Sequence, residues 1–300
     1  MYPKDNVLPN VILVVGGTRK LSWLRKCKKK GTRIVHRLDG ILWQHKVSSC
    51  SLKIKIVSEA YNWLSRIIRN IFADTVIYQS QFIMDCWHRQ YGKASCKETV
   101  IYNAVSLSEF CPGSDSQDNS LPKLLCVEGS ILSGPAYIQP LIFLSKRLYD
   151  LGLISGTVVY GHIERGGYNK LSSSATLKLA GVIPREQIPH ILRNAVYLVL
   201  EVNPPCPNSV IEALAAGIPV IGFDTGALAE LVPPEAGIIV PYGADPWRLD
   251  VPDLESLESA AIKVLKNWQE YSKGARKIAE ERFNLDNMVE KYISVLSPES

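Results

Sequence analysis

The chain has 300 residues and a mass of 33.3 kDa, which is long enough for two domains that each bury a core of their own. Its 46% hydrophobic and 21% charged residues exclude a fibrous or intrinsically disordered protein. Its seven cysteines have neither the density of a disulfide scaffold nor a CxxC pair for zinc, so we expect reduced thiols.

The charge is unevenly divided along the chain. Residues 1–118 carry 18 Lys and Arg against 9 Asp and Glu, a net +9, whereas the remainder carries 16 against 20, a net −4. No apolar core of a signal peptide follows Met1, and no run reaches the roughly 20 apolar residues that cross a bilayer. We therefore expect a cytoplasmic chain that is neither secreted nor membrane-spanning.

The N-terminal half alternates short apolar runs with helical patterns. Apolar, largely β-branched runs predict strands at residues 10–17, 33–38, 75–78 and 99–102. Apolar residues at helical spacing predict helices at residues 20–30, 53–72 and 80–91. This alternation is typical of a parallel, doubly wound sheet.

The stretch Cys111 to Leu121 is rich in Pro, Gly, Ser and Asp, which predicts a linker. The alternation then restarts, with strands predicted at 124–128, 156–161, 195–201 and 219–223, helices at 138–151, 185–194 and 209–216, and further helices over 254–282 and 285–296. We expect a short Rossmann-like domain over 1–118, a second one over 119–282, and a helix over 283–300 that we hypothesise packs back on the first domain.

The most informative stretch is residues 203–232, NPPCPNSVIEALAAGIPVIGFDTGALAELV, in which a polar loop opens into a helix that ends at Gly217. The backbone N–H groups of Asn208, Ser209 and Val210 at such a junction attract phosphate oxygens. Ser209 is predicted to cap the helix, with Glu212 at the capping-box position. A simple helix cap, with no ligand, is the alternative interpretation of this pair.

Residues 207–221 (PNSVIEALAAGIPVI) and 226–232 (GALAELV) resemble the donor-site region of the retaining glycosyltransferases of family 4, within glycosyl transferase group 1. Residues 181–195, 73–110 and 33–40 (RIVHRLDG) resemble other segments of that family. The resemblance implies a GT-B architecture, with two Rossmann-like parallel-sheet domains facing a central cleft and an abbreviated N-terminal domain.

The resemblance also implies how a UDP- or GDP-sugar is bound. Glu212 would hold the ribose hydroxyls, and the amides near Asn208, Ser209 and Val210 would hold the pyrophosphate. A base-contacting loop would comprise Val182, Ile183 and Pro184. The implied reaction transfers a hexose-type sugar with retention, without a covalent enzyme nucleophile, in polysaccharide or glycolipid synthesis.

The sequence departs from the family pattern at two places in this donor site. The family's first glutamate falls on Pro204, and Glu201 three residues earlier is the candidate to compensate. The family's phosphate-clamping Arg and Lys are replaced near Gly129 and Ser130. Positive charge would then come from elsewhere, with Arg165 and His162 in GHIERGG, Arg37, Lys170 or a divalent metal as candidates. Gly161 of the same stretch is a further candidate donor-binding residue.

On the N-terminal side the resemblance points to the end of the second predicted strand. His36, Arg37 and Asp39 are the candidate catalytic residues there, and Gly16, Gly17 and Arg19 are the candidate acceptor-side residues. A buried core histidine and an ordinary turn aspartate are the alternatives for His36 and Asp39. No cluster of Asp, Glu and His has metal-ligand spacing, so we expect no bound metal and no tightly bound cofactor, and leave open whether a divalent metal assists.

The stretch Lys20 to Lys30 (KLSWLRKCKKK) combines basic residues with Trp23. Such a stretch suits an anionic membrane surface, or is simply a solvated helix face. We hypothesise peripheral contact with the inner face of the membrane and a saccharide or polyprenyl-diphosphate-linked acceptor, and we expect no nucleic-acid partner. The alternative functions are a non-catalytic nucleotide-sugar-binding subunit and a sugar-nucleotide epimerase.

Overall fold

The computed structural model describes residues 8–113, 120–172 and 174–297 and divides the chain into two compact units. Unit 1 is Met1–Tyr102 with Asp286–Ser300, and unit 2 is Asn103–Leu285. Unit 1 holds a four-stranded parallel sheet and unit 2 a six-stranded one. The prediction of two parallel-sheet α/β domains, the N-terminal one smaller, is therefore confirmed.

The sheet of unit 1 has its strands in chain order. They are β1 (Val11–Val15), β2 (Arg33–Leu38), β3 (Thr75–Tyr78) and β4 (Lys97–Val100). The connections contain α1 (Leu21–Lys29), the 3-10 turn η1 (Gln44–Lys46), α2 (Leu52–Ile67) with the π-helical turn η2 (Ile68–Phe72), and α3 (Gln81–Tyr91). Right-handed crossovers that all progress in one direction place their helices on one face of a sheet.

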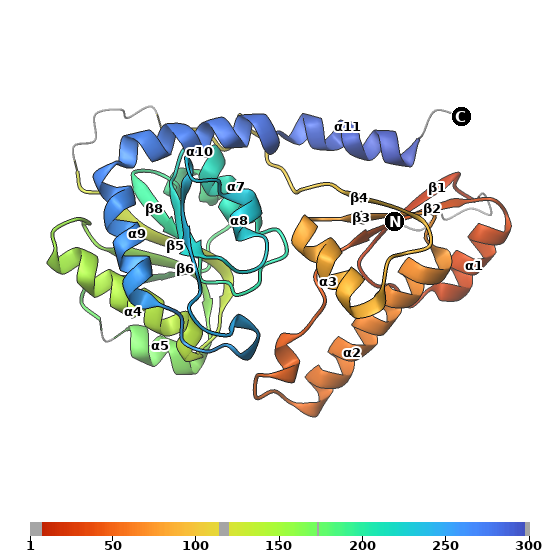
Figure 1. Cartoon of the computed structure of the whole chain (residues 1–300), viewed down its shortest axis with the longest axis horizontal. Helices are drawn as coiled ribbons and strands as arrows, with labels where there is room; N and C mark the ends of the chain where they lie inside the picture. The colour runs from red at the N-terminus through yellow and green to blue at the C-terminus, as the bar shows by residue number, and fades with distance from the viewer. Residues whose placement is uncertain (1–7, 114–119, 173, 298–300) are drawn as a thin grey trace. The chain divides into compact units, whose positions relative to one another are not determined.

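Strand alternation sends side chains of β2 and β3 to two separate cores in unit 1. Ile34 and Val76 face the helices of the crossovers, in clusters with α1, η2 and α3. Val35 and Ile77 face the other way, where α11 (Leu285–Leu296) packs against them with Met288, Tyr292, Val295 and Leu296. Figure 1 shows α11 running along the side of this sheet that α1, α2 and α3 leave bare.

A buried arginine joins several elements of unit 1. The side chain of Arg69, on η2, is 0% exposed and donates from Nε to the Tyr78 hydroxyl (2.8 Å) and from Nη2 to the Gly92 carbonyl (2.7 Å). Glu98 lies 3.2 Å from Nη2 and accepts from the Tyr78 hydroxyl at 2.5 Å. The carboxylate of Glu98 and these hydrogen bonds compensate the buried charge of Arg69 within unit 1.

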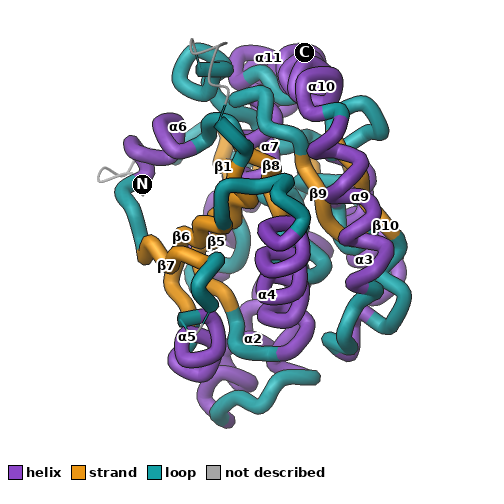
Figure 2. Tube along the Cα trace, turned by 90° about the vertical axis from the view of Figure 1, so that its left-hand side faces the viewer, coloured by secondary structure: helices purple, strands orange, loops and turns teal. Residues whose placement is uncertain are grey.

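The sheet of unit 2 is wound in both directions from its first strand. Its strands are β5 (Lys123–Ile131), β6 (Thr157–Ile163), β7 (Leu177–Gly181), β8 (Ala195–Leu198), β9 (Val220–Phe223) and β10 (Gly237–Val240). Their order is β10-β9-β8-β5-β6-β7, which Figure 2 shows as a row with β7 at one end and α4 in front. The direction of winding reverses between β5 and β8.

The helices of unit 2 cover both faces of its sheet. They are α4 (Pro135–Asp150), α5 (Arg165–Leu171), the short turns η3 (Arg185–Gln187) and α6 (Ile188–Ile191), α7 (Asn208–Ala215), α8 (Leu228–Leu231), η4 (Pro246–Arg248), α9 (Leu254–Lys266) and α10 (Trp268–Arg282). The predicted helix over 254–282 is thus two helices, which meet at Asn267. Strands β7 and β10 and helices α5 and α8 were not predicted.

The division between the units falls between residues 102 and 103, whereas the prediction placed it after residue 118. The segment after Tyr102 belongs to unit 2 because it packs there. Val105 pairs with Asn284, Phe110 is 1% exposed, and Arg276 Nη1 donates to the Phe110 carbonyl. Of the predicted linker at 111–121, residues 114–119 lie outside the described residues.

No helix within the described ranges combines the length and the apolar character that crossing a bilayer requires.

The packing of α11 on unit 1 gives a testable prediction. Val295→Lys places a charge against Val35, Ile77 and Ile101, and we expect a loss of about 1–3 kcal/mol in the free energy of unfolding. Ile293, 57% exposed on the same helix, is the matched control, and Ile293→Lys is expected to stay within about 0.5 kcal/mol. Urea unfolding measures both, and equal losses would contradict the packing of α11.

Candidate functional site

In unit 2 the functional candidates gather where the winding of the sheet reverses. Ligands of open α/β sheets bind outside the carboxyl ends of the strands at such a point. Tyr197, on β8, ties the two central strands together, because its hydroxyl donates to the Val127 carbonyl of β5 at 2.6 Å. Glu128 on β5 and Glu201 after β8 follow directly at this edge.

Helix α7 begins beside this edge, but not with the cap that the sequence predicted. Its N-cap residue is Pro207, no side chain caps it, and Ser209 instead interacts with the buried Tyr197. The predicted serine cap and capping box are therefore wrong. Asn208 Oδ1 accepts from Asn103 Nδ2 at 2.9 Å, and Val210 is buried. Because no side chain caps α7, its first N–H groups have no partner from the helix itself or from a cap, and they can bind an anion.

Glu212 is bound to an arginine instead of a helix cap. The residue is 2% exposed, and its Oε1 lies 2.7 Å from Nη2 of Arg185. Burial raises the pKa of Glu212, and the charge and hydrogen bond of Arg185 oppose that rise. A carboxylate has about four acceptor positions, so Glu212 can accept further donors beside this arginine.

The predicted base-contacting loop lies between β7 and Arg185. Gly181 ends β7 with a positive φ of +72°, which turns the chain outward. Val182 is 73% exposed, and Ile183 and Pro184 are at least partly exposed. An exposed apolar loop that leads into the partner of Glu212 offers a surface on which a flat ring can stack.

Glu128 and Glu201 influence each other at the carboxyl edge. Burial, and next the charge of Glu201, raise the pKa of Glu128 to about 8, against hydrogen bonds from the amides of Leu200 and Glu201. The Leu200 amide donates to Glu128 Oε1 at 3.4 Å. Burial also raises the pKa of Glu201. Glu128 is therefore largely protonated at neutral pH and can donate a hydrogen bond, which an ionised carboxylate cannot.

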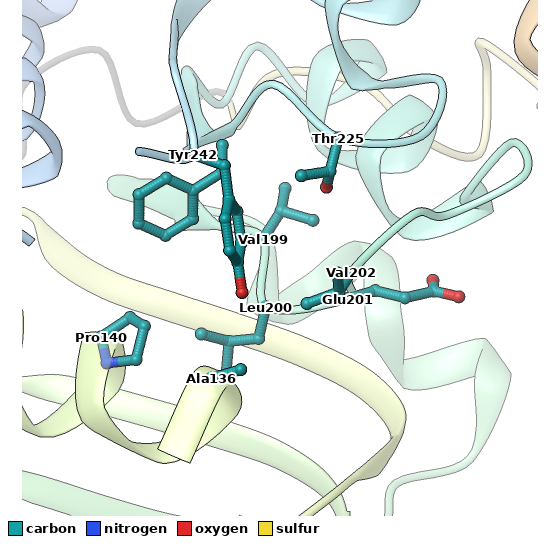
Figure 3. A pocket seen from close by; sticks show the side chains of 9 residues that line it. Ala136, Pro140, Val199, Leu200, Glu201, Val202, Thr225 and Tyr242 are labelled. Carbon is teal, nitrogen blue, oxygen red and sulfur yellow. The ribbon is translucent and has the colours of Figure 1, made fainter. Parts of the chain in front are cut away.

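Glu201 also lines a small pocket beside the edge, in which Figure 3 shows the Tyr242 hydroxyl directed toward Leu200 and Ala136 and the Glu201 carboxylate directed away from Pro140. The lining residues are Ala136, Pro140, Val199, Leu200, Glu201, Val202, Phe223, Thr225 and Tyr242.

Pro204, the position of the family's first glutamate, is buried against a glycine loop. Its carbonyl accepts from the Ala227 amide at 2.9 Å, and a Cβ on Gly226 would lie 2.4 Å from its backbone nitrogen. The preceding Asn203 has a positive φ of 56°, and its buried Nδ2 has no hydrogen-bond partner among the described residues. The backbone of this segment is closely packed even though the carboxylate is missing.

The glycine–serine segment of β5 lies beside GHIERGG of β6. Ser130 pairs with His162 after an irregularity in the register, and both are exposed. Gly161 permits the irregularity, because a Cβ at its φ of +134° would lie 1.9 Å from the Glu128 carbonyl. The structure thus brings Gly129, Ser130, Gly161 and His162 together, and places Arg165 at the start of α5 and Lys170 near its end.

In unit 1 the predicted catalytic strand ends beside the Gly16–Gly17 turn. His36 is 0% exposed, and its Nε2 lies 2.8 Å from the Gly16 carbonyl, while the Gly16 amide donates to the Arg37 carbonyl. Burial lowers the pKa of His36 to about 4; the hydrogen bond to Gly16 opposes this shift and the charge of Arg69 adds to it. His36 is therefore neutral at pH 7 and fixes the turn from inside.

Asp39 is the hub of the polar groups at this edge. Its carboxylate accepts from Arg37 Nη1 at 2.8 Å, from Gln79 Nε2, and from the Tyr61 hydroxyl at 3.5 Å. The side chain keeps 39% exposure, so part of the carboxylate faces solvent. Tyr61 also packs on Gly16, where a Cβ would lie 2.3 Å from its hydroxyl.

The edge therefore unites five of the six N-terminal candidates, His36, Arg37, Asp39, Gly16 and Gly17, and leaves Arg19 exposed ahead of α1.

Four residues of these two edges were not predicted: Glu128, Arg185, Tyr61 and Gln79. Glu128 could have been identified from the sequence, because it is a charged residue directly after an apolar strand run. The other three reach their partners only through the tertiary fold. Within the described parts of the chain no group of three or more His, Cys, Asp or Glu could hold a metal ion.

The comparisons with known proteins concern the fold and part of unit 2. A family model described as Glycosyl transferases group 1 matches residues 157–267. The solved structure of sucrose-phosphate synthase from Thermosynechococcus elongatus superposes with a TM-score of 0.73 at 17% identity, over 95% of this chain and 72% of that one. The comparison with curated proteins found no match.

Two further solved structures are similar over almost the whole chain. HepE of Anabaena, in complex with UDP-glucose, has a TM-score of 0.69 at 16% identity and covers 96% of this chain and 79% of its own. A glycosyltransferase from Rickettsia africae has a TM-score of 0.66 at 15% identity, with 97% and 78% covered. The chain has a GT-B-type fold. The family match and these neighbours support a GT-B glycosyltransferase, whereas family 4 membership and retention stay predictions.

The buried His36 of this GT-B chain predicts a pH dependence of stability. An unfolded histidine takes up a proton below about pH 6.5, while folded His36 does so only near pH 4. The contribution of His36 to the free energy of unfolding is therefore complete above pH 6.5. It decreases as the pH falls, by about 2 kcal/mol at pH 5. We expect the loss between pH 7.5 and 5, measured by urea unfolding, to be smaller by that amount in His36→Gln. An identical loss in both proteins would refute this role.

Proposed function

We propose that the chain is a glycosyltransferase that moves a hexose-type sugar from a UDP- or GDP-sugar to a saccharide or lipid-linked acceptor with retention. The observation that carries the proposal is the buried Glu212 on α7, one turn from the free N–H groups of that helix, at the edge where the winding of the sheet reverses. This combination of a buried acceptor and a positive helix end suits a ribose followed by a diphosphate.

In the donor site each group has a defined task. Glu212 accepts hydrogen bonds from the ribose hydroxyls, and the exposed loop at Val182–Pro184 receives the base. The amides of Asn208, Ser209 and Val210 hold the diphosphate, with Gly129, Ser130, Gly161 and His162 lining its other side. The protonated Glu128 donates a hydrogen bond where the family uses a cation, and Glu201 accepts from the sugar.

On the acceptor side we assign Asp39 and Arg37 to the contact with the incoming hydroxyl, since both are partly exposed. His36, Gly16 and Gly17 act through the shape of the turn, and Arg19 adds positive charge at the rim. No enzyme nucleophile attacks the sugar: the new bond forms on the face from which the diphosphate leaves, and a departing phosphate oxygen takes the acceptor's proton.

The solved neighbours support a nucleotide-sugar substrate. HepE was crystallised with UDP and with UDP-glucose, and the pneumococcal O-GlcNAc transferase GtfA, of which this chain covers 57%, with UDP and GlcNAc. These ligands belong to those proteins, and their transfer to this chain is part of the proposal.

A second candidate is a nucleotide-sugar-binding subunit without transferase activity. Pro204 favours it, because proline supplies no carboxylate at the position of the family's first glutamate. Slow hydrolysis of a bound nucleotide sugar, followed by chromatography of released UDP or GDP, distinguishes an enzyme from such a subunit. An epimerase would instead convert the donor with no acceptor and no release of nucleotide.

Nucleotide binding tests the donor site directly. We expect UDP or GDP to bind in a calorimeter, and Glu212→Ala to weaken that binding by about 10- to 100-fold, because the ribose loses a buried acceptor. Glu270→Ala, at an exposed position of α10, is the matched control and should bind as the unaltered chain does. If neither nucleotide binds the unaltered protein, the proposed function is wrong.

Glu128 predicts how that affinity depends on pH. Below about pH 8 the neutral carboxyl donates to a phosphate oxygen, and above it the ionised carboxylate repels the diphosphate. We expect affinity to fall as the pH rises from 7 to 9, and Glu128→Gln, which stays neutral, to lose this dependence. A pH profile that the substitution leaves unchanged would remove Glu128 from the site.

A further inference from the structure

Helix α2 packs on unit 1 with a polar side. Its buried residues are Ser58, Asn62 and Ser65, which are 9%, 2% and 1% exposed. Asn62 bonds the backbone of Leu42 in both directions, accepting from its N–H at 2.9 Å and donating to its carbonyl at 2.8 Å. Small polar side chains fit here because the Gly16–Gly17 turn approaches α2 closely, with the Gly17 position next to Ser65.

Several large apolar residues of α2 lie in solvent, on the side opposite these polar residues. We call this set the apolar face: Leu52 (72% exposed), Ile56 (61%), Val57 (54%) and Trp63 (57%), with Ile71 of η2 (62%) continuing it. Leu52, Ile56 and Trp63 follow one another at spacings of about one or two helical turns, so they form a single stripe. The sequence pattern alone would have turned this stripe toward the core.

This arrangement reverses the usual orientation of a surface helix, whose apolar stripe is buried and whose polar side is wet. Two residues of the preceding loop, Leu42 and Val47, are also exposed, at 42% and 46%. A stripe of exposed apolar side chains on one helix is typical of an interaction site.

Positive charge surrounds the apolar face. Lys53 and Lys55 lie exposed within its first turns, and Arg66 near its end. The one acidic residue of α2, Glu59, is already paired with His45 (2.8 Å) and Lys46 (3.2 Å). Helix α1, which packs against η2 in the same cluster, adds further exposed cations: Arg25, Lys26, Lys29 and Lys30.

We propose that the apolar face of α2 and its flanking cations dock unit 1 onto an anionic lipid surface. Apolar side chains with an exposed tryptophan insert at the boundary between headgroups and acyl chains, and the lysines meet the lipid phosphates. A second copy of the chain fits less well, because a two-fold contact through this face would bring its lysines against their own copies. The surface shares no residue with the proposed donor site, so its test does not depend on transferase activity.

The test is co-sedimentation of the full chain with vesicles. We expect binding to vesicles of phosphatidylcholine with phosphatidylglycerol, little binding to phosphatidylcholine alone, and release by salt. Ile56→Ser with Trp63→Ser should lower the partition coefficient by about tenfold or more, because two inserted side chains are lost. Lys53→Glu with Lys55→Glu should reduce binding to anionic vesicles in particular.

Two controls keep the result interpretable. Ile293→Ser changes an equally exposed apolar residue on α11, across the sheet from α2, and should bind vesicles as the unaltered chain does. The α2 variants should keep the thermal unfolding midpoint, since they alter exposed positions. Equal binding by the unaltered chain and the Ile56/Trp63 variant overturns the proposal. A dimer in sedimentation velocity that this variant dissociates assigns the face to a second copy, and also overturns it.

Discussion

A parallel sheet whose crossovers all progress in one direction receives helices on one face only, and unit 1 meets this constraint with the last helix of the chain. Val35 and Ile77 on the bare face are covered by α11, which is reached only after the whole of unit 2 has been traversed. This side of the sheet is therefore covered by residues more than 200 positions away in sequence. A fragment ending near residue 102 would lack α11 and would expose the apolar side chains on that side of the sheet.

Unit 2 satisfies the same constraint internally. Its strands leave β5 in both directions, so helices cover both faces and the carboxyl ends of β5 and β8 diverge. Glu128, Glu201 and the start of α7 gather at that divergence because the topology leaves room there. Their perturbed protonation follows from the same place, since a half-closed edge removes water from carboxyl groups without supplying a cation to each.

The sequence predicted best where local pattern and burial agree. The strands at residues 33–38 and 75–78 are apolar runs between clear turns, and both have those bounds in the structure. Strand β7 was missed because Lys178 interrupts a five-residue run at the edge of the sheet, and β10 because it has four residues. In such elements, pairing with a neighbouring strand contributes more than the local pattern does.

The sequence predicted where the candidate donor site lies along the chain, but it did not predict most of the contacts within it. The loop before α7 was located from its residues, but Ser209 turned to Tyr197 and Glu212 to Arg185, partners that only the tertiary fold brings near. The same limit explains α2, where the periodicity identified the helix and its apolar stripe. Which side of the helix met the sheet was decided by the close approach of the Gly16–Gly17 turn.

The pairing of Glu212 with Arg185 has a consequence for the energetics of recognition. Arg185 sits on a short 3-10 turn with a side chain that is 59% exposed, whereas Glu212 is enclosed. The carboxylate therefore loses its water when the protein folds, and its charge is balanced by Arg185 before any ligand binds. A ribose hydroxyl of the proposed nucleotide would add to the hydrogen bond from Arg185 or replace it, so selectivity at this position would depend on geometry more than on charge.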